Sequence, residues 1–238
     1  MKNLFKFDAN SASYNLKTYL VIGATGSIGS KITELLKNNK YEVIKGSSAK
    51  HTDASFIHID LTDNATISKL TEWNKSLDGI IFASGYEPKQ SLREMSLEHQ
   101  NKMIQIHVTG PLNTVKALLK NVKENASIIF ISSIAAYKGS YDPMYATVKG
   151  ATISLCKTLA VELSKNKIRV NCIAPGLVED SVVYKGMSLD FREKHINNTL
   201  DKKLATADDC ANTINFLLIQ EHITGQVIHI NGGQYFGA

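Results

Sequence analysis

The chain has few of the residues that mark several classes of protein. Among 238 residues there are three cysteines, no CxxC pair and only four prolines. Cys156, Cys172 and Cys210 are odd in number and widely spaced, which argues against a disulfide framework and against a metal or redox centre. They predict three small buried side chains in a reducing compartment. The histidines show no metal-ligand spacing, so no metal site is expected.

Long apolar runs and blocks of one charge are also missing. No stretch approaches the roughly 18 consecutive apolar residues of a membrane span, and the first 16 residues lack the apolar core of a signal peptide. Lysine and arginine exceed aspartate and glutamate by 27 to 22, a net charge of +5, but the basic residues are dispersed along the chain. A nucleic-acid-binding protein usually gathers them in a stripe. The sequence therefore predicts a cytoplasmic protein that binds neither nucleic acid nor membrane.

Hydrophobic residues make up 43% of the chain and follow two alternating patterns. Short apolar runs predict strands, and longer segments with helical spacing separate most of them. Runs without in/out alternation are typical of strands covered on both faces, so the pattern predicts a parallel sheet between helices, a doubly wound α/β fold. The sequence predicts one domain at 17–238, an N-terminal appendage at 1–16 that includes Phe5 and Phe7, and about seven strands. The predicted strands are 19–22, 41–44, 56–59, 79–82, 127–131, 168–172 and 227–230.

Two long helices are predicted at 97–119 and 145–163. On the first, apolar residues with helical spacing predict the face that packs on the sheet: Leu97, Ile104, Val108, Leu112, Val115 and Leu119. A second apolar stripe on the two helices consists of Ile106, Leu118, Ile153 and Leu159. Two apolar stripes are more than one face against the sheet can bury, which favours contact between subunits.

A glycine-rich turn, Gly23-Ala-Thr-Gly26-Ser-Ile-Gly29, joins the first strand to an amphipathic helix. Glycines allow a tight turn and a close approach of the backbone to a ligand. The N-terminus of the helix offers N–H groups and a positive dipole end to a phosphate. In a doubly wound sheet this position predicts a dinucleotide site of the Rossmann type, with a purely structural turn as the alternative.

The end of the second strand bears on which dinucleotide is bound. The chain reads Lys45-Gly-Ser47-Ser48-Ala-Lys50, with no acid before Asp53. A site specific for NAD usually keeps a carboxylate there for the ribose 2′-hydroxyl. Two lysines and two hydroxyls suit a 2′-phosphate, so NADP is predicted in preference to NAD. The alternative is a polar turn that tolerates both.

Tyr145 and Lys149 are four residues apart, which places both side chains on one face of a helix. An ammonium there is expected to lower the pKa of the phenol from its ordinary value near ~10. A tyrosine tuned in this way can exchange a proton with a carbonyl or hydroxyl group. Ser132 and Ser133 lie about twelve residues upstream at a predicted strand end. The alternative is an ordinary helix with a partly exposed tyrosine and no catalytic role. The presence of the glycine turn in the same chain argues against this alternative.

Taken together, these motifs resemble the short-chain dehydrogenase/reductase family over residues 18–233. The segment 168–176, IRVNCIAPG, is similar to a family segment, as are ITGQ at 223–226 and INGG at 230–233. Asp60, followed by Leu61, matches the acid that the family uses near adenine. The length fits the single-domain branch, and the layout is nearest to the ketoacyl-carrier-protein reductases.

The resemblance implies a role for each matching residue. Tyr145 would be the general acid, Lys149 would bind the nicotinamide ribose and lower the tyrosine pKa, and Ser133, rather than Ser132, would bind the substrate carbonyl. His107 would take the fourth catalytic position. The implied cofactor-binding residues are Gly23, Thr25, Ser27, Ile28, Gly29, Ser47, Ser48, Asp60, Leu61, Ala83, Ser84, Gly85, Tyr145, Lys149, Pro175, Gly176 and Val178.

The chain departs from the family pattern at four places. The middle glycine of the turn comes one position early, and Phe82-Ala-Ser-Gly85 stands where NNAG is usual. His107 replaces an asparagine; we expect a structural substitute, with a new catalytic base as the alternative. Asp180 stands where a threonine often reaches the carboxamide, and an ionised carboxylate cannot donate a hydrogen bond.

The leading hypothesis is an NADP(H)-dependent oxidoreductase that interconverts a carbonyl and a secondary alcohol, with hydride transfer and a tyrosine proton donor. One alternative is a member of the same family acting on a sugar nucleotide or another biosynthetic intermediate. Another is a cofactor-binding regulator or scaffold without catalysis. The resemblance also implies a homo-oligomer, with a tetramer expected before a dimer.

Overall fold

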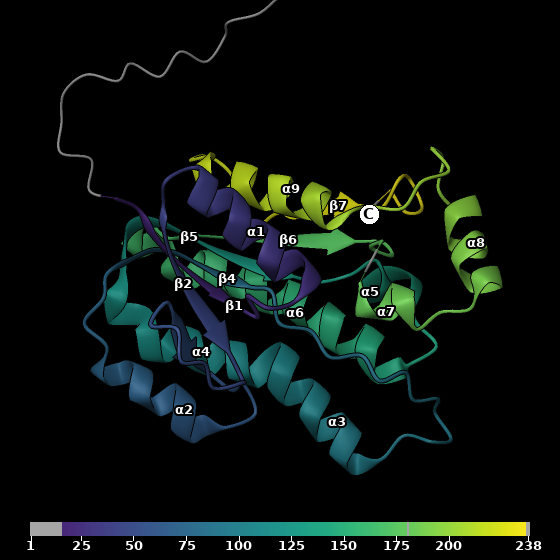
Figure 1. The fold of residues 1–238 in the computed structure, drawn as a ribbon, viewed down its shortest axis with the longest axis horizontal. Helices are drawn as coiled ribbons and strands as arrows, with labels where there is room; N and C mark the ends of the chain where they lie inside the picture. Colours follow the sequence, from purple (N-terminus) through teal and green to yellow (C-terminus); the bar gives the residue numbers. More distant parts are fainter. Residues whose placement is uncertain (1–15, 180, 237–238) are drawn as a thin grey trace, which may run out of the picture.

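A seven-stranded parallel sheet forms the centre of the molecule in the computed structural model, which describes residues 16–179 and 181–236 (Figure 1). The order is β3-β2-β1-β4-β5-β6-β7, and every adjacent pair is parallel. This confirms the predicted doubly wound fold. The strands are β1 Thr18–Ile22, β2 Glu42–Ser47, β3 Phe56–His58, β4 Leu77–Phe82, β5 Val122–Ile131, β6 Arg169–Pro175 and β7 Val227–Ile230. Residues 1–15, with Phe5 and Phe7, lie outside the described residues.

Helices cover both faces of the sheet, because alternate side chains of each strand point to opposite sides. Helices α1 (Ser27–Asn38) and α9 (Ala207–Ile219) cover one face, where Val21, Ile81 and Ile129 are buried. Helices α2 (Asn64–Ser68), α4 (Gly110–Leu118) and α6 (Pro143–Glu162) cover the other. The remaining helices are α3 (Leu97–Ile104), α5 (Ala135–Lys138), α7 (Val182–Lys185) and α8 (Leu189–Asn197).

The predicted helix 97–119 is not one regular helix. A π-helical turn, Gln105–Thr109, separates α3 from α4. Each π-helical turn takes up an additional residue and so rotates the face that follows it. The core side of this region carries Met103, His107 and Leu118.

The predicted roles of the two apolar stripes are wrong for most of their residues, although Val115 of the sheet-facing stripe is buried as predicted. Most of the stripe assigned to the sheet is exposed, with Leu97 69%, Ile104 39%, Leu112 39% and Leu119 41% exposed. In the stripe assigned to a subunit contact, Leu118, Ile153 and Leu159 are buried within the chain. The exposed residues of these two stripes lie on α3, on α4 and directly after α4.

The three cysteines are buried as unpaired thiols, as predicted. In the described residues no helix is both long enough and apolar enough to cross a membrane. Among residues 16–179 and 181–236, no group of three or more histidine, cysteine or acidic side chains is arranged to hold a metal ion.

Candidate active site

The strand order reverses between β1 and β4, the position where doubly wound sheets bind ligands at their carboxyl ends. The turn after β1 starts at Gly23, whose φ is +83°, and a Cβ atom there would collide with the backbone of Ser84. A Cβ at Gly29 would collide with the carbonyl of Gly23. Both glycines are required for α1 to start this close to the sheet, and Ser84 is brought next to the turn.

The N-terminus of α1 offers unused hydrogen-bond donors. Gly26 is its N-cap, no side chain caps it, and the first turn contains no acidic residue. The first N–H groups of a helix have no intrahelical acceptors, so those of Ser27 and Ile28 are available to an anion together with the helix dipole. Thr25 is exposed beside them. This arrangement fits the pyrophosphate of a dinucleotide.

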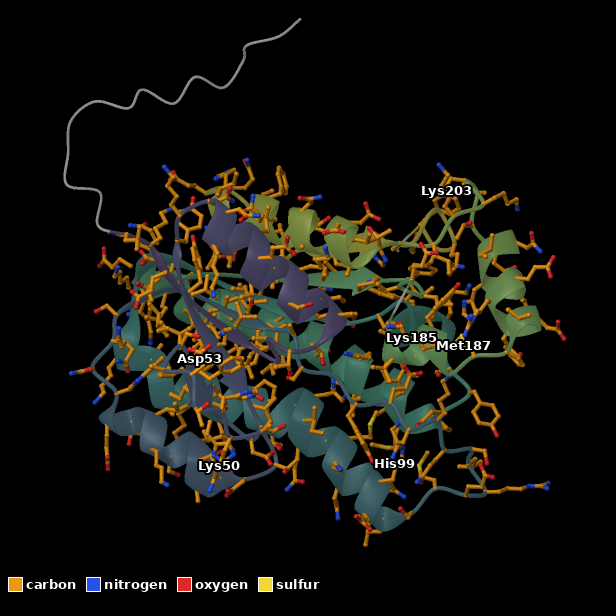
Figure 2. The ribbon with its side chains drawn as sticks, viewed as in Figure 1. Lys50, Asp53, His99, Lys185, Met187 and Lys203 are labelled. Atoms are coloured by element: carbon orange, nitrogen blue, oxygen red, sulfur yellow. The ribbon has the colours of Figure 1, made fainter. Side chains whose placement is uncertain are left out.

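The segment after β2 differs from the expectation in one respect. Lys45 forms an ion pair with Asp53 at 2.8 Å, so only Lys50 of the two predicted lysines remains for a phosphate (Figure 2). Ser47 Oγ lies 3.0 Å from His51 Nε2, and the carbonyl of Ser48 lies 2.9 Å from His58 Nε2. The strand end therefore carries hydroxyls, one lysine and two imidazoles, and the Asp53 carboxylate of this segment is paired with Lys45.

The other predicted cofactor residues lie along the same edge. Asp60 accepts hydrogen bonds from the N–H and hydroxyl of Thr62, at 2.8 and 2.7 Å, and so shapes its own turn. Ala83 continues β4 by donating to Ile22. Leu61 and Val178 are buried, whereas Gly85 is exposed. Pro175 ends β6, and the N–H of Gly176 bonds to Ile230. Asp180 lies outside the described residues.

Helix α6 positions Tyr145 and Lys149. Asp142 is its N-cap and accepts a hydrogen bond from the N–H of Tyr145 at 3.1 Å, and Pro143 follows at the first helical position. The Lys149 Nζ lies 5.5 Å from the centre of the Tyr145 ring, which agrees with the predicted one-turn spacing. Lys149 is only 4% exposed, and its ammonium donates to the carbonyl of Ile131 at 2.9 Å.

The two serines at the end of β5 have different partners. Ser132 Oγ donates to the carbonyl of Lys149 at 2.8 Å and supports the helix backbone. Ser133 Oγ accepts from the N–H of Ala135 and is the serine that reaches the Tyr145 phenol, whose pKa it lowers by hydrogen bonding. Ser133 is thus the serine next to the candidate acid.

The pKa of Tyr145 is raised, whereas the sequence analysis predicted that it would be lowered. Burial of the phenol and the nearby charge of Glu87 raise it above its ordinary value. Burial also lowers the pKa of the Lys149 ammonium, to about 8, and the hydrogen bond of this ammonium goes to the carbonyl of Ile131. Tyr145 therefore holds its proton firmly in this chain.

His107 lies in the π-helical turn. Its Nε2 donates to the carbonyl of Tyr86 at 3.1 Å, and its own carbonyl accepts from Thr152 Oγ1 at 3.2 Å. Burial, followed by the charge of Lys149, lowers the pKa of the imidazole to about 3, so the ring is neutral. Its contacts support a structural role beside Tyr145, whose ring is 6.3 Å away, centre to centre.

Three residues near Tyr145 were not predicted from the sequence to belong to the site. His99, on α3, bonds through Nε2 to Asp142 at 2.9 Å, and both side chains are 1% exposed (Figure 2). Asp142 also accepts from the N–H of Gln90 at 3.2 Å. Glu87 lies in the same loop and is largely buried, which raises the pKa of its carboxyl to about 7. The Asp-Pro pair at 142–143 is a helix-start signal that the sequence offered; nothing local marked Glu87 or His99.

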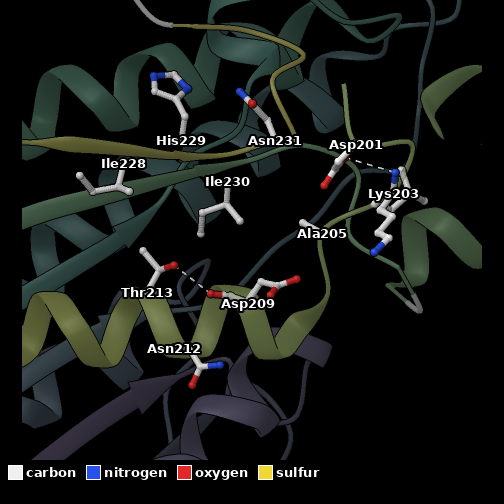
Figure 3. Close-up of a pocket in the computed structure, with 12 residues that line it drawn as sticks. Asp201, Lys203, Ala205, Asp209, Asn212, Thr213, Ile228, His229, Ile230 and Asn231 are labelled. Carbon is white, nitrogen blue, oxygen red and sulfur yellow. Dashed lines mark hydrogen bonds between the residues drawn. The ribbon is translucent and has the colours of Figure 1, made fainter. Parts of the chain in front are cut away.

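A cavity of about 450 Å³ lies elsewhere, between β7, α9 and the segment 201–205 (Figure 3). Its lining includes Asp209, Thr213 and Asn231 but none of the predicted catalytic or cofactor residues. A much smaller cavity of about 10 Å³ touches His107, Ile131 and Thr152, and its size suits a single water molecule.

Comparison with known proteins agrees with this geometry. The sequence family described as "Enoyl-(Acyl carrier protein) reductase" matches residues 23–234. The 3-oxoacyl-[acyl-carrier-protein] reductase FabG of Buchnera aphidicola (subsp. Schizaphis graminum) is 28% identical over 92% of this chain and 97% of its own. A short chain dehydrogenase family protein from Francisella tularensis has a TM-score of 0.83 at 30% identity, covering 92% of this chain and 98% of that one. A small-chain dehydrogenase in complex with NADPH has a TM-score of 0.80 at 25% identity, covering 92% and 99%.

The chain belongs to the short-chain dehydrogenase/reductase family. Within that family it resembles the 3-oxoacyl-[acyl-carrier-protein] reductases. It is an oxidoreductase of this family, and a nicotinamide dinucleotide is its cofactor class.

Proposed function

We propose that this protein is an NADP(H)-dependent reductase of carbonyl compounds that also catalyses the reverse oxidation of secondary alcohols. The observation that carries the proposal is the convergence of Ser133, Tyr145 and Lys149 at the carboxyl edge of the sheet, beside an uncapped α1 N-terminus. A scaffold without catalysis would not need three such groups in one place.

Each group has a defined task in this proposal. The nicotinamide supplies or accepts the hydride, and the protein orients the substrate and moves the proton. Ser133 binds the substrate oxygen, and Tyr145 donates its phenolic proton to that oxygen. Lys149 binds the ribose and stabilises the phenolate left behind, while His107 keeps the π-helical turn against the active-site loop.

The mouth of this site supports an apolar or extended substrate. Leu92, Val182 and Phe191, on segments that we expect to contact the substrate, are 60–86% exposed. The names of the related 3-oxoacyl reductases support a thioester as the first probe.

Oxidation of NADPH, followed at 340 nm against a carbonyl panel, tests the function directly. The panel should include acetoacetyl-N-acetylcysteamine, simple ketones and keto-sugar nucleotides. Turnover of a thioester or ketone supports the proposal, and turnover of only the sugar derivatives supports the sugar-nucleotide alternative. Tight NADPH binding with no turnover across the panel favours the scaffold.

We expect NADPH to bind at least about tenfold more tightly than NADH, because the β2 end offers hydroxyls and Lys50 but no carboxylate. Ser47→Asp should erase or reverse this preference, since a carboxylate repels a 2′-phosphate and accepts from a 2′-hydroxyl. Calorimetric titration measures both dissociation constants. Ser164→Asp, an equal charge change at an exposed serine, is the control, and equal affinities in the wild type would refute NADP preference.

We also propose a homotetramer, with a dimer as the second choice. The support is the exposed apolar surface formed by Leu97 of α3, Leu112 of α4 and Leu119 directly after α4, together with Val161 of α6, which is 77% exposed. Surfaces of this kind mark protein contacts. Light scattering at micromolar concentration should give the mass of four chains; a monomer mass would contradict the proposal. A cytoplasmic location remains a prediction.

A further inference from the structure

The carboxylate of Asp142 joins three segments of the chain that are far apart in the sequence. One of its oxygens accepts from the N–H of Tyr145 at 3.1 Å, in the first turn of α6. The other accepts from the N–H of Gln90 at 3.2 Å, in the loop after β4, and lies 2.9 Å from Nε2 of His99 on α3. A carboxylate can only accept hydrogen bonds, so Nε2 is the donor in the last of these. The side chains of His99 and Asp142 are both 1% exposed, so all three bonds are shielded from water.

The loop after β4 is also bonded to the helix that carries His99. The side-chain oxygen of Gln90 accepts from the N–H of Ser96 at 3.0 Å. Ser96 is the N-cap of α3, and its hydroxyl accepts from the N–H of His99 at 3.1 Å. Further back in the loop, the carbonyl of Tyr86 accepts from His107 at 3.1 Å. The loop and the start of α3 therefore form one hydrogen-bonded unit, which Asp142 connects to the start of α6.

His99 leaves one of its ring nitrogens without a partner. Its Nδ1 is buried, and no group of the described residues bonds to it. An unpaired polar atom in the interior lowers stability, and apolar side chains of similar volume in place of a buried ionic pair are often neutral or stabilising. The His99–Asp142 pair is therefore a weak source of stability, and what it provides is a fixed geometry between α3, the loop and α6.

We propose that His99 is a positioning residue of this active site: through Asp142 it fixes the start of α6, which carries Tyr145, relative to the loop after β4, which we expect to contact the substrate. The inference rests on the proposed function, in which Tyr145 is the proton donor. Proton transfer requires the donor and the substrate oxygen in the correct geometry, and a small displacement lowers the rate by a large factor. The pyrophosphate and 2′-phosphate positions lie at α1 and β2, so cofactor affinity should not depend on this pair.

The His99→Met and His99→Gln variants separate hydrogen bonding from shape. The two side chains have similar length and helix propensity, but the glutamine amide can donate to Asp142 and the methionine thioether cannot. In His99→Met, kcat for carbonyl reduction should fall about tenfold or more and the KM of the carbonyl should rise, with NADPH affinity unchanged. His99→Gln should restore most of the loss. His222→Met, the same change at an exposed histidine, should behave as wild type.

Hydrogen exchange followed by mass spectrometry tests the pair without turnover. The segments 86–92 and 140–147 contain the two N–H groups that Asp142 binds. Without the His99 donor, Asp142 is a buried charge with one partner fewer, so its site opens to water more readily. Exchange in both segments should be about tenfold faster or more in His99→Met, the factor expected for a lost hydrogen bond to a charged group, and close to wild type in His99→Gln. The segment 210–218 of α9, on the opposite face of the sheet, should be unchanged in both variants.

The two measurements separate this inference from the proposed function. Unchanged exchange in both segments of a folded His99→Met protein overturns the inference, whether or not any substrate is found. Faster exchange with wild-type kcat and KM also overturns it, because the pair would then only stabilise the fold. Faster exchange in a protein that reduces no carbonyl supports the connection between α3, the loop and α6 and refutes the proposed function.

If His99→Met fails to fold, Asp142→Asn provides the same two measurements. Asparagine still caps α6, but its amide group leaves one oxygen where the carboxylate had two. Faster exchange in 86–92 and a lower kcat are expected, and wild-type values of both would overturn the inference.

Discussion

Turnover by Tyr145→Phe should be about 10²–10⁴-fold lower than wild type, the range typical of a general acid. The substitution removes one oxygen and leaves the ring, its edge contact with His107 and the helix start at Asp142 in place. NADPH affinity should therefore change little. Steady-state kinetics on any carbonyl that the wild type reduces, together with NADPH titration, measure both quantities.

Tyr141→Phe is the matched control. Tyr141 lies four residues earlier, is 72% exposed and should be replaceable without effect. If Tyr145→Phe retains wild-type turnover, another group supplies the proton and the proposed assignment is wrong.

Lys149→Met should weaken NADPH binding by about 10-fold or more, the loss expected when a hydrogen bond to a charged group disappears. Turnover should fall as well, because the phenolate then has no cation beside it. The melting temperature should stay close to that of the wild type, since the cost of burying the ammonium offsets its hydrogen bond to Ile131. Calorimetry and kinetics on the purified protein separate these effects.

The pKa of Lys149 predicts how NADPH affinity changes with pH. Burial lowers the pKa of Lys149 to about 8, so its charge is present below pH 8 and is lost above it. NADPH affinity of the wild type should fall as pH rises through 8, and the dependence should disappear in Lys149→Met. Lys157→Ala, an exposed lysine on the same helix, should behave as wild type. A Lys149→Met protein with normal NADPH affinity at pH 7 would contradict the role.

Local patterns were sufficient for the architecture. Apolar runs such as 79–82 mark strands because both faces of a parallel sheet are covered, and the glycine turn marks the first connection because only glycine fits at Gly23. Tyr145 and Lys149 lie where their spacing predicted, since four residues make about one helical turn. These features depend on neighbours within a few residues along the chain.

The π-helical turn was not predictable in the same way. It interrupts the regular helix of 97–119, and it occurs where Gln105–Thr109 pack against the active-site loop and α6. Lys45 likewise looked available for a phosphate until the fold paired it with Asp53. In both cases a contact that forms only in the folded chain decides the outcome, and the residues adjacent in the sequence do not.

Short-range periodicity and spacing are enough to specify the doubly wound sheet, the glycine turn, the Tyr145–Lys149 spacing and the family. The buried face of α3 and α4, the serine that reaches the phenol and the groups around Tyr145 depend on contacts that exist only in the folded chain. Glu87 and Tyr145 are 58 residues apart in the sequence, and they belong to one site only because the loop after β4 is hydrogen-bonded to His107 and to the start of α6. The protonation state of an active site depends on such contacts, since burial and nearby charge are properties of the folded chain.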